Sequence, residues 1–151
     1  RDYYASRGLG DVYKRQSCTF TATDEKGVYD LIAKDVPLNN GVPFKAVLTD
    51  GRLVINFDNQ YLGFISPNYI YLCAYDKAAN VLTWGGNITY VADLQFTKAG
   101  LPFFEFKDDG TWKDHKVDGF MYGIFDKKWE NGGQFAGKSY GYAVDIVMEH
   151  Q

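Results

Sequence analysis

Apolar and polar residues alternate with a period of two along most of this chain. The longest alternating run covers residues 87–98 and places five apolar side chains on one side, Ile88, Tyr90, Ala92, Leu94 and Phe96. Such a period is typical of a β-strand that buries one face, because successive side chains point to opposite faces of a sheet. The pattern therefore predicts strands as the main elements.

The clearest predicted element is a hairpin over residues 43–58. Asp50-Gly51 suits a two-residue loop in which both central residues take positive φ. This loop sets Thr49 opposite Arg52 and Leu48 opposite Leu53, and a slip of one residue would mix the two faces. In this register one face is apolar and carries Phe44, Ala46, Leu48, Leu53, Ile55 and Phe57.

Shorter runs predict the other strands. Residues 28–34 fit either a helix or a strand, and the strand-rich surroundings favour a strand. Gly85-Gly86 is expected to close another hairpin. Residues 139–149 are expected to form the last strand, with Tyr140, Tyr142, Val144, Ile146 and Met148 facing inward. The remaining strands are expected at residues 18–23, 61–66, 69–76, 81–84, 101–107, 111–113 and 120–126.

About ten to twelve short strands with no convincing helix predict an all-β fold. Two architectures fit this pattern: a single antiparallel β-barrel (a calycin-like meander) or a β-sandwich. The short connections favour the barrel, because neighbours in sequence should then pair. The length favours one domain, which we place at residues 17–151.

Residues 1–16 show neither an apolar period nor a strand pattern. They read RDYYASRGLGDVYKRQ and resemble the translated sequencing-adapter sequence found at the ends of metagenomic open reading frames. We therefore expect a non-native, disordered leader, with a genuine basic leader as the alternative. On the first interpretation the natural N-terminus and any export signal are missing.

Charge and hydropathy bear on whether the protein binds nucleic acid or spans a membrane. The net charge is −3 and no stripe of Lys and Arg is present, which argues against nucleic acid. No apolar run approaches the roughly 20 residues that span a membrane as a helix. Cys18 and Cys73 leave three alternatives open: two buried thiols, a disulfide, or a lipidated Cys18 at a lipoprotein cleavage site.

No residues form a convincing catalytic or metal-binding set. Asp108 and Asp109 lie side by side at a hairpin tip, so they do not flank a cleft as a glycosidase pair does. Residues 107–119 hold four aspartates without the alternating spacing of a calcium loop. His115 and His150 have neither ligand spacing nor a nucleophile elbow. We expect no metal and no cofactor, and the sequence leans against an enzyme.

One short motif resembles a known repeat. Ala74, Asp76, Asn80 and Trp84 have the spacing A-x-D-x-x-x-N-x-x-x-W, which is similar to the blade motif of quinoprotein-type propellers. It occurs once, whereas a propeller needs several blades of about 40 residues. We interpret it as a hairpin in which Trp84 packs back over the turn, and it implies no cofactor.

Aromatic residues are the main functional signal. They make up 17% of the chain, with 12 Tyr, 11 Phe and 3 Trp. Flat rings bind sugar faces or apolar molecules with little loss of side-chain freedom. The candidate ligand-binding residues are Trp129, Trp112, Trp84, Tyr71 and Tyr75.

Together these features favour a non-catalytic, extracytoplasmic bacterial domain that binds a glycan or a small apolar ligand through surface aromatics. The first alternative is a structural or adhesion module with every aromatic in the core. The second is a fragment of a larger secreted enzyme. The exposure of the three Trp rings distinguishes the binding domain from the structural module.

Overall fold

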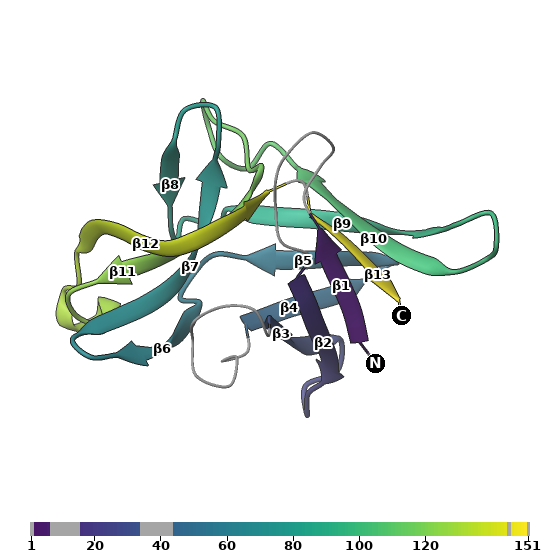
Figure 1. The fold of residues 1–151 in the computed structure, drawn as a ribbon, viewed down its shortest axis with the longest axis horizontal. Coiled ribbons are helices and arrows are strands. Elements are labelled where there is room, and N and C mark those ends of the chain that lie inside the picture. The colour runs from purple at the N-terminus through teal and green to yellow at the C-terminus, as the bar shows by residue number, and fades with distance from the viewer. Residues whose placement is uncertain (1, 7–15, 34–43, 145, 151) are drawn as a thin grey trace.

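The protein, described here by a computed structural model, has an all-β fold, as predicted (Figure 1). The structure describes residues 2–6, 16–33, 44–144 and 146–150. Eight antiparallel strands form a closed barrel in the order β1-β13-β10-β9-β5-β4-β3-β2. Their bounds are β1 (Asp2–Ser6), β2 (Gln16–Ala22), β3 (Val28–Ala33), β4 (Phe44–Thr49), β5 (Arg52–Asn56), β9 (Thr89–Phe96), β10 (Pro102–Asp108) and β13 (Val147–His150).

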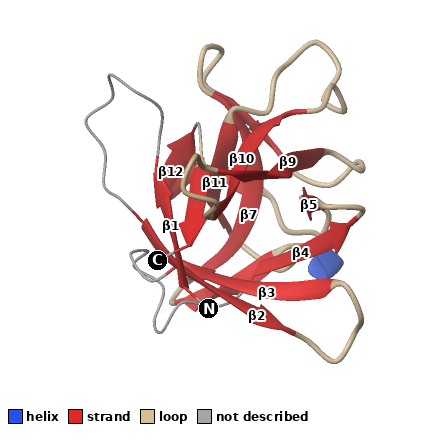
Figure 2. Ribbon diagram, turned by 90° about the vertical axis from the view of Figure 1, so that its right-hand side faces the viewer, coloured by secondary structure: helices blue, strands red, loops and turns tan. Residues whose placement is uncertain are grey.

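A second antiparallel sheet lies beside the barrel, on the left in Figure 1. Its order is β12-β11-β7-β6, and β8 pairs with the end of β7 that β6 leaves free. Figure 2 shows one short helical turn, the 3-10 turn η1 (Trp129–Asn131). The strand bounds are β6 (Tyr61–Ile65), β7 (Asn68–Asp76), β8 (Val81–Thr83), β11 (Gly119–Phe125) and β12 (Phe135–Val144).

The hairpin β4–β5 has the predicted register. Thr49 pairs with Arg52 and Leu48 with Leu53. Asp50 and Gly51 have φ of 52° and 74°, the positive values that the two-residue loop requires. Its apolar face is buried, with Leu48 partly so, and the buried residues are Phe44, Ala46, Leu53, Ile55 and Phe57. Residue 43, the predicted start of the hairpin, lies outside the described residues.

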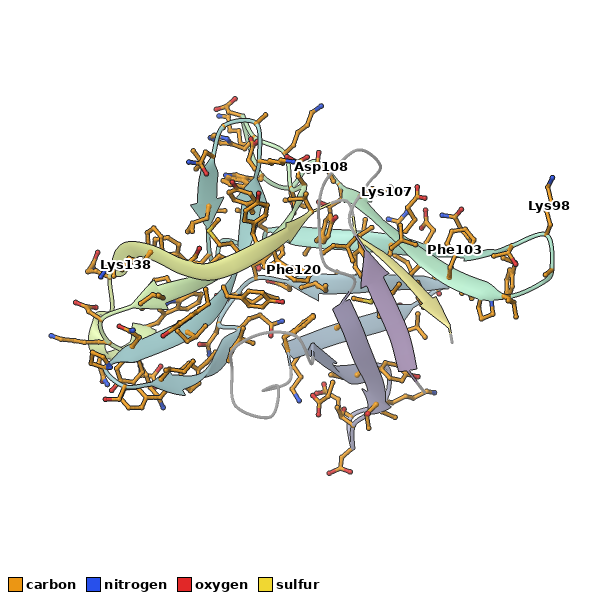
Figure 3. All side chains as sticks on the ribbon, viewed as in Figure 1. Lys98, Phe103, Lys107, Asp108, Phe120 and Lys138 are labelled. Carbon is orange, nitrogen blue, oxygen red and sulfur yellow. The ribbon has the colours of Figure 1, made fainter. Side chains whose placement is uncertain are left out.

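One main core joins the barrel to the second sheet. It includes Leu53 and Ile55 from the barrel, and Leu72 and Ile124 from the second sheet. Phe120 of β11 packs against Phe44 of β4, with ring centroids 5.6 Å apart, and Figure 3 shows it near the centre of the molecule. The two sheets therefore bury their apolar faces against each other.

The predicted hairpin at Gly85-Gly86 is wrong. β8 pairs with β7 in the second sheet, whereas β9 pairs with β5 and β10 in the barrel. Gly85, Gly86 and Asn87 have φ of 76°, 66° and 60° in succession. The backbone N–H of Gly85 donates to the Phe57 carbonyl oxygen at 3.1 Å. This segment thus carries the chain from one sheet to the other.

The predicted strand at residues 111–113 is also wrong. The segment is a turn in which the Asp109 carboxylate accepts hydrogen bonds from the backbone N–H and the hydroxyl of Thr111. Asp114 has φ of 67°, which turns the chain again. Local side-chain hydrogen bonds of Asp and Thr favour turns over sheet pairing.

Regular structure begins earlier than the sequence predicted. β1 spans five of the residues assigned to a disordered leader and pairs with β2 and β13. The expectation of no strand in residues 1–16 is therefore wrong for Asp2–Ser6 and for Gln16, the first residue of β2. Residues 7–15 lie outside the described part of the chain. The adapter origin of this stretch stays a prediction.

Two predicted inward faces are buried over only part of their length. The run at residues 139–149 contributes to two strands, β12 and β13, and Tyr142 is 37% exposed. In β9 the predicted inward face is buried only up to Ala92, while Leu94 and Phe96 are exposed. The β9–β10 hairpin extends beyond the barrel, on the right in Figure 1, which agrees with the exposure of these two side chains.

Candidate ligand-binding pocket

The outer face of the second sheet carries its own aromatic cluster. On β7, Ile70 and Leu72 belong to the main core, while the alternate residues Tyr71 and Cys73 point to the other face and are fully buried there. We call this second group the outer aromatic cluster. It comprises Tyr61, Tyr69, Tyr71, Cys73, Leu82, Trp84, Phe125, Trp129 and Phe135.

Trp129 covers Tyr71 on this face. Their rings are stacked, with centroids 4.3 Å apart and 4° between the planes. The backbone N–H of Trp129 donates to the Tyr71 hydroxyl oxygen at 3.0 Å. Gly132, with φ of 79°, donates its N–H to the Trp129 carbonyl oxygen and ends the turn η1. The glycine-rich stretch therefore folds this Trp back onto the sheet.

Trp84 lies in the same cluster. Its ring meets Phe125 edge-on, with centroids 5.0 Å apart and an angle of 89°. Its centroid is 6.0 Å from that of Phe135 on β12. Edge-on pairs of this kind add to the stabilisation that burial provides. Three of the five predicted ligand-binding residues, Tyr71, Trp84 and Trp129, thus belong to one surface cluster, and both Trp rings remain partly exposed.

A pocket of about 560 Å³ adjoins this cluster. Trp84 forms part of its wall, and Tyr75, another predicted residue, also lines it. β8 and β12 supply residues to the lining, as do β7 and β11. The described residues that line it are Tyr75, Asn80, Val81, Leu82, Trp84, Met121, Phe135, Gly137, Lys138 and Ser139.

Some polar groups of the pocket already form hydrogen bonds within the protein. The Tyr75 hydroxyl donates to Asn80 Oδ1 at 2.8 Å. Burial raises the pKa of the Tyr75 hydroxyl, and the neighbouring Tyr142 adds to the shift, so Tyr75 stays protonated at neutral pH. The Ser139 hydroxyl oxygen accepts the N–H of Gly141 at 3.4 Å. Lys138, labelled in Figure 3, is exposed and is the one charged residue among the described residues of the lining.

Sequence reasoning missed several lining residues. Ser139 lies on the outward side of a predicted strand, so the alternation indicated it. No face was predicted for the strand that holds Met121. Lys138 and Asn80 lie in predicted connections, and nothing in the sequence links them. The pairing of β7 with β8, of β7 with β11 and of β11 with β12 brings these segments together.

Trp112 lies in the main core, away from the pocket. It is 9% exposed, belongs to the main core, and has its ring centroid 4.7 Å from that of His115. His115 Nδ1 is 3.0 Å from Asp76 Oδ2. The structure thus separates Trp112 from the other candidate residues, and it takes no part in the pocket.

Asp76 shapes the β7–β8 turn. Its carboxylate accepts the N–H groups of Ala79 and Lys116 as well as the contact with His115. Burial alone would raise the pKa of Asp76, but these hydrogen bonds outweigh burial and hold it below its usual value. With Asn80 at φ of 53°, the motif that resembles a propeller blade is here a single hairpin turn.

Three of the four aspartates considered as a calcium loop accept hydrogen bonds from other groups of the protein. Asp108 accepts the N–H of Val117, and Asp118 accepts the N–H of Lys77. Asp109 accepts from Thr111, as noted, and from the hydroxyl of Thr89. Within the described ranges, no three His, Cys, Asp or Glu residues group in a way that would hold a metal ion.

Cys73 is a free, buried thiol, and burial raises its pKa to about 12. The thiolate is the reactive form, so at about pH 8 Cys73 should not react with a disulfide reagent while the protein is folded. We expect this in a Cys18→Ser variant treated with dithiobis(nitrobenzoate), followed by absorbance. In about 6 M guanidinium one thiol per chain should react at once. Rapid labelling of the folded variant would contradict the burial of Cys73.

The fold and the pocket define a class: an all-β protein with a closed barrel, an attached sheet and an aromatic pocket on the outer face of that sheet. In the part of the chain that the structure describes, no helix is both long and apolar enough to cross a membrane. Comparison with models of protein families, with curated proteins and with solved structures gave no match.

Proposed function

We propose that this protein is a non-catalytic binding module that takes a small ligand into the pocket between β8 and β12. The ligand would be a carbohydrate or a small hydrophobic molecule, which share a flat apolar face. The observation that carries the proposal is the pocket itself, which adjoins the partly exposed ring of Trp84 and is lined by Tyr75 and Phe135.

The size and walls of the pocket support this function. Sites for small molecules typically measure about 300–1,000 Å³ and combine apolar walls with a few polar groups that orient the ligand. This pocket has that volume and that combination. The contacts of Trp84 with Phe125 and Phe135 hold its ring in place. A ligand would therefore meet a surface that is already ordered, which lowers the entropy cost of binding.

The same proposal includes an extracytoplasmic location in a bacterium. It is supported by the all-β architecture, the acidic net charge of −3 and the aromatic content of 17%. A domain that binds carbohydrate or apolar nutrients would meet its ligand there. Fractionation of cells that express the chain from its complete gene would test this point: recovery in the cytoplasmic fraction would contradict it.

A substitution that fills the pocket tests the proposed binding function. Val81 lines the pocket and is 38% exposed, so Val81→Trp should fill the space without disturbing the core. The probes are N-phenyl-1-naphthylamine for apolar ligands, followed by its fluorescence, and the methyl glycosides of common hexoses, followed by calorimetry. We expect binding of at least one probe, weakened at least about tenfold in Val81→Trp.

Val47→Trp is the matched control. Val47 is 41% exposed on β4 of the barrel and does not line the pocket, so this variant should bind like the wild type. No binding of any probe, or equal loss in both variants, would contradict the proposed function. The first of these results would favour a structural module in its place.

A further inference from the structure

The end of the β9–β10 hairpin carries apolar side chains on both of its faces. Phe96 pairs with Pro102 on one face, whereas Phe103 pairs with Gln95 on the other. Leu101 precedes Pro102, so alternation along the strand places it on the face of Phe103. Phe96 is 64% exposed and Leu101 is 53% exposed. Exposed apolar side chains that gather at one place, unlike single ones, indicate a contact surface.

This end of the hairpin stands away from the body of the protein. Figure 1 shows β9 and β10 extending beyond the barrel, and Figure 3 shows Lys98 at the far end of the hairpin. Leu94, two residues behind Phe96 on the same face, is also exposed. The exposed apolar side chains therefore form a projecting tip, which we define as residues 94–104, and a partner can reach it from more than one side.

The backbone at the turn of this tip is already hydrogen-bonded. The N–H of Thr97 donates to the Leu101 carbonyl oxygen at 2.9 Å, and the N–H of Gly100 donates to the Thr97 carbonyl oxygen at 2.9 Å. The N–H of Leu101 donates to the Thr97 hydroxyl oxygen at 3.1 Å. Unpaired backbone groups are costly in a medium without water. These three N–H groups need no water, which suits an apolar environment.

The tip carries a single charge, and that charge is positive. Residues 94–104 contain no Asp or Glu, and Lys98 is their one charged side chain. Lys98 is exposed and has no ion-pair partner among the residues that the structure describes. The nearest carboxylates in the sequence, Asp93 and Glu105, face each other behind the tip, and Asp93 is bonded to two basic side chains at 3.0 and 2.9 Å. The ammonium group of Lys98 is thus available to an anionic partner.

We propose that this tip inserts into the surface of a lipid bilayer, with Phe96 and Leu101 among the acyl chains and Lys98 at the headgroup phosphates. A protein partner that packed on one face of the hairpin would leave the other face in water, whereas a bilayer surrounds an inserted tip on every side. Elements that lie at this boundary bury their apolar side chains by about 5–10 Å. The long stem of a lysine lets its ammonium group stay at the headgroups. This inference is independent of the pocket.

Flotation with lipid vesicles tests the inference. The full chain is mixed with vesicles of phosphatidylcholine, either pure or with about 30% phosphatidylglycerol, and the bound fraction is measured at several lipid concentrations. We expect binding to both kinds of vesicle. Binding to the anionic vesicles should be about fivefold tighter, because one basic side chain near an anionic surface contributes about that factor. Equal binding to both kinds would overturn the role of Lys98.

Three variants separate the apolar contacts from the charge. The double variant Phe96→Ser/Leu101→Ser should bind at least about tenfold more weakly, because two large apolar side chains no longer leave water. Val47→Ser/Val81→Ser is the matched control, since both residues are exposed and apolar but lie outside the hairpin. Lys98→Gln should weaken binding to the anionic vesicles by about fivefold and leave binding to the neutral ones unchanged. Circular dichroism checks that each variant is folded.

The remaining outcomes decide against the bilayer. Absence of flotation with either kind of vesicle would overturn the inference, as would equal binding of the wild type and Phe96→Ser/Leu101→Ser. Sedimentation velocity examines the other occupant, a second copy of the chain. A wild-type dimer that the two serines convert to a monomer would assign the tip to that contact and overturn membrane insertion. None of these results bears on the pocket, so the proposed function stands or falls by its own probes.

Discussion

Phe120→Ala is expected to lower the free energy of unfolding by about 3–5 kcal/mol, the usual cost of truncating a buried Phe to Ala. Phe120 is 1% exposed and contacts Phe44 of the barrel and Tyr122 of its own strand, with ring centroids 5.6 and 5.8 Å away. Its removal leaves a cavity at the junction of the two sheets. Urea unfolding followed by circular dichroism measures the loss.

Phe96→Ala provides the comparison for this prediction. Phe96 is 64% exposed near the end of the β9–β10 hairpin, so the same change should cost no more than about 0.5 kcal/mol. Similar losses in the two variants would contradict a shared core in which Phe120 joins the sheets.

Gly133→Ala is expected to have the second largest effect, a loss of more than about 2 kcal/mol in the free energy of unfolding. A Cβ at this position would lie 2.1 Å from the Lys127 carbonyl oxygen and 3.0 Å from that of Lys128. Both atoms belong to the backbone, so the whole turn must move. Trp129 would then lose its stacking on Tyr71, and the near-ultraviolet circular dichroism of the pair should decrease.

Gly132→Ala is the control for this turn. A Cβ there meets open space, and only the φ of 79° is unfavourable, so we expect a loss of about 1 kcal/mol and no change in the near-ultraviolet spectrum. An unchanged spectrum in Gly133→Ala would contradict the close backbone approach described here.

The local elements could be predicted because their causes are local. Asp50-Gly51 imposes positive φ and so determines the register of β4–β5. Residues 61–66 and 69–76 were predicted as strands and form β6 and β7. The alternation at residues 69–76 indicated β7, which is buried on both faces.

The sheet to which each strand belongs could not be predicted. Gly85-Gly86 has the composition of a hairpin loop, yet the chain leaves the second sheet there and enters the barrel. The choice depends on which distant strand offers an unpaired edge, and β5 lies far away in sequence. Local pattern contains no information about that partner.

The candidate site was predicted only in part for the same reason. Trp84 and Tyr75 line the pocket and were candidates because they are aromatic, and their role in binding stays a prediction. Trp112 was expected at a hairpin end, but the segment is a turn in which the Trp112 ring is buried in the core. Lys138 and Asn80 became neighbours of one pocket only through long-range pairing.

The width of the pocket depends on the twist of the second sheet. Its walls come from β8 and β12, which are separated by β7 and β11 in the order of pairing. Each step between neighbouring strands rotates by roughly 20–25°, and the rotations accumulate across a sheet. Substitutions on the inner face that change this rotation, such as those at Leu72 or Ile124, would therefore alter the shape of the pocket without touching any residue that lines it.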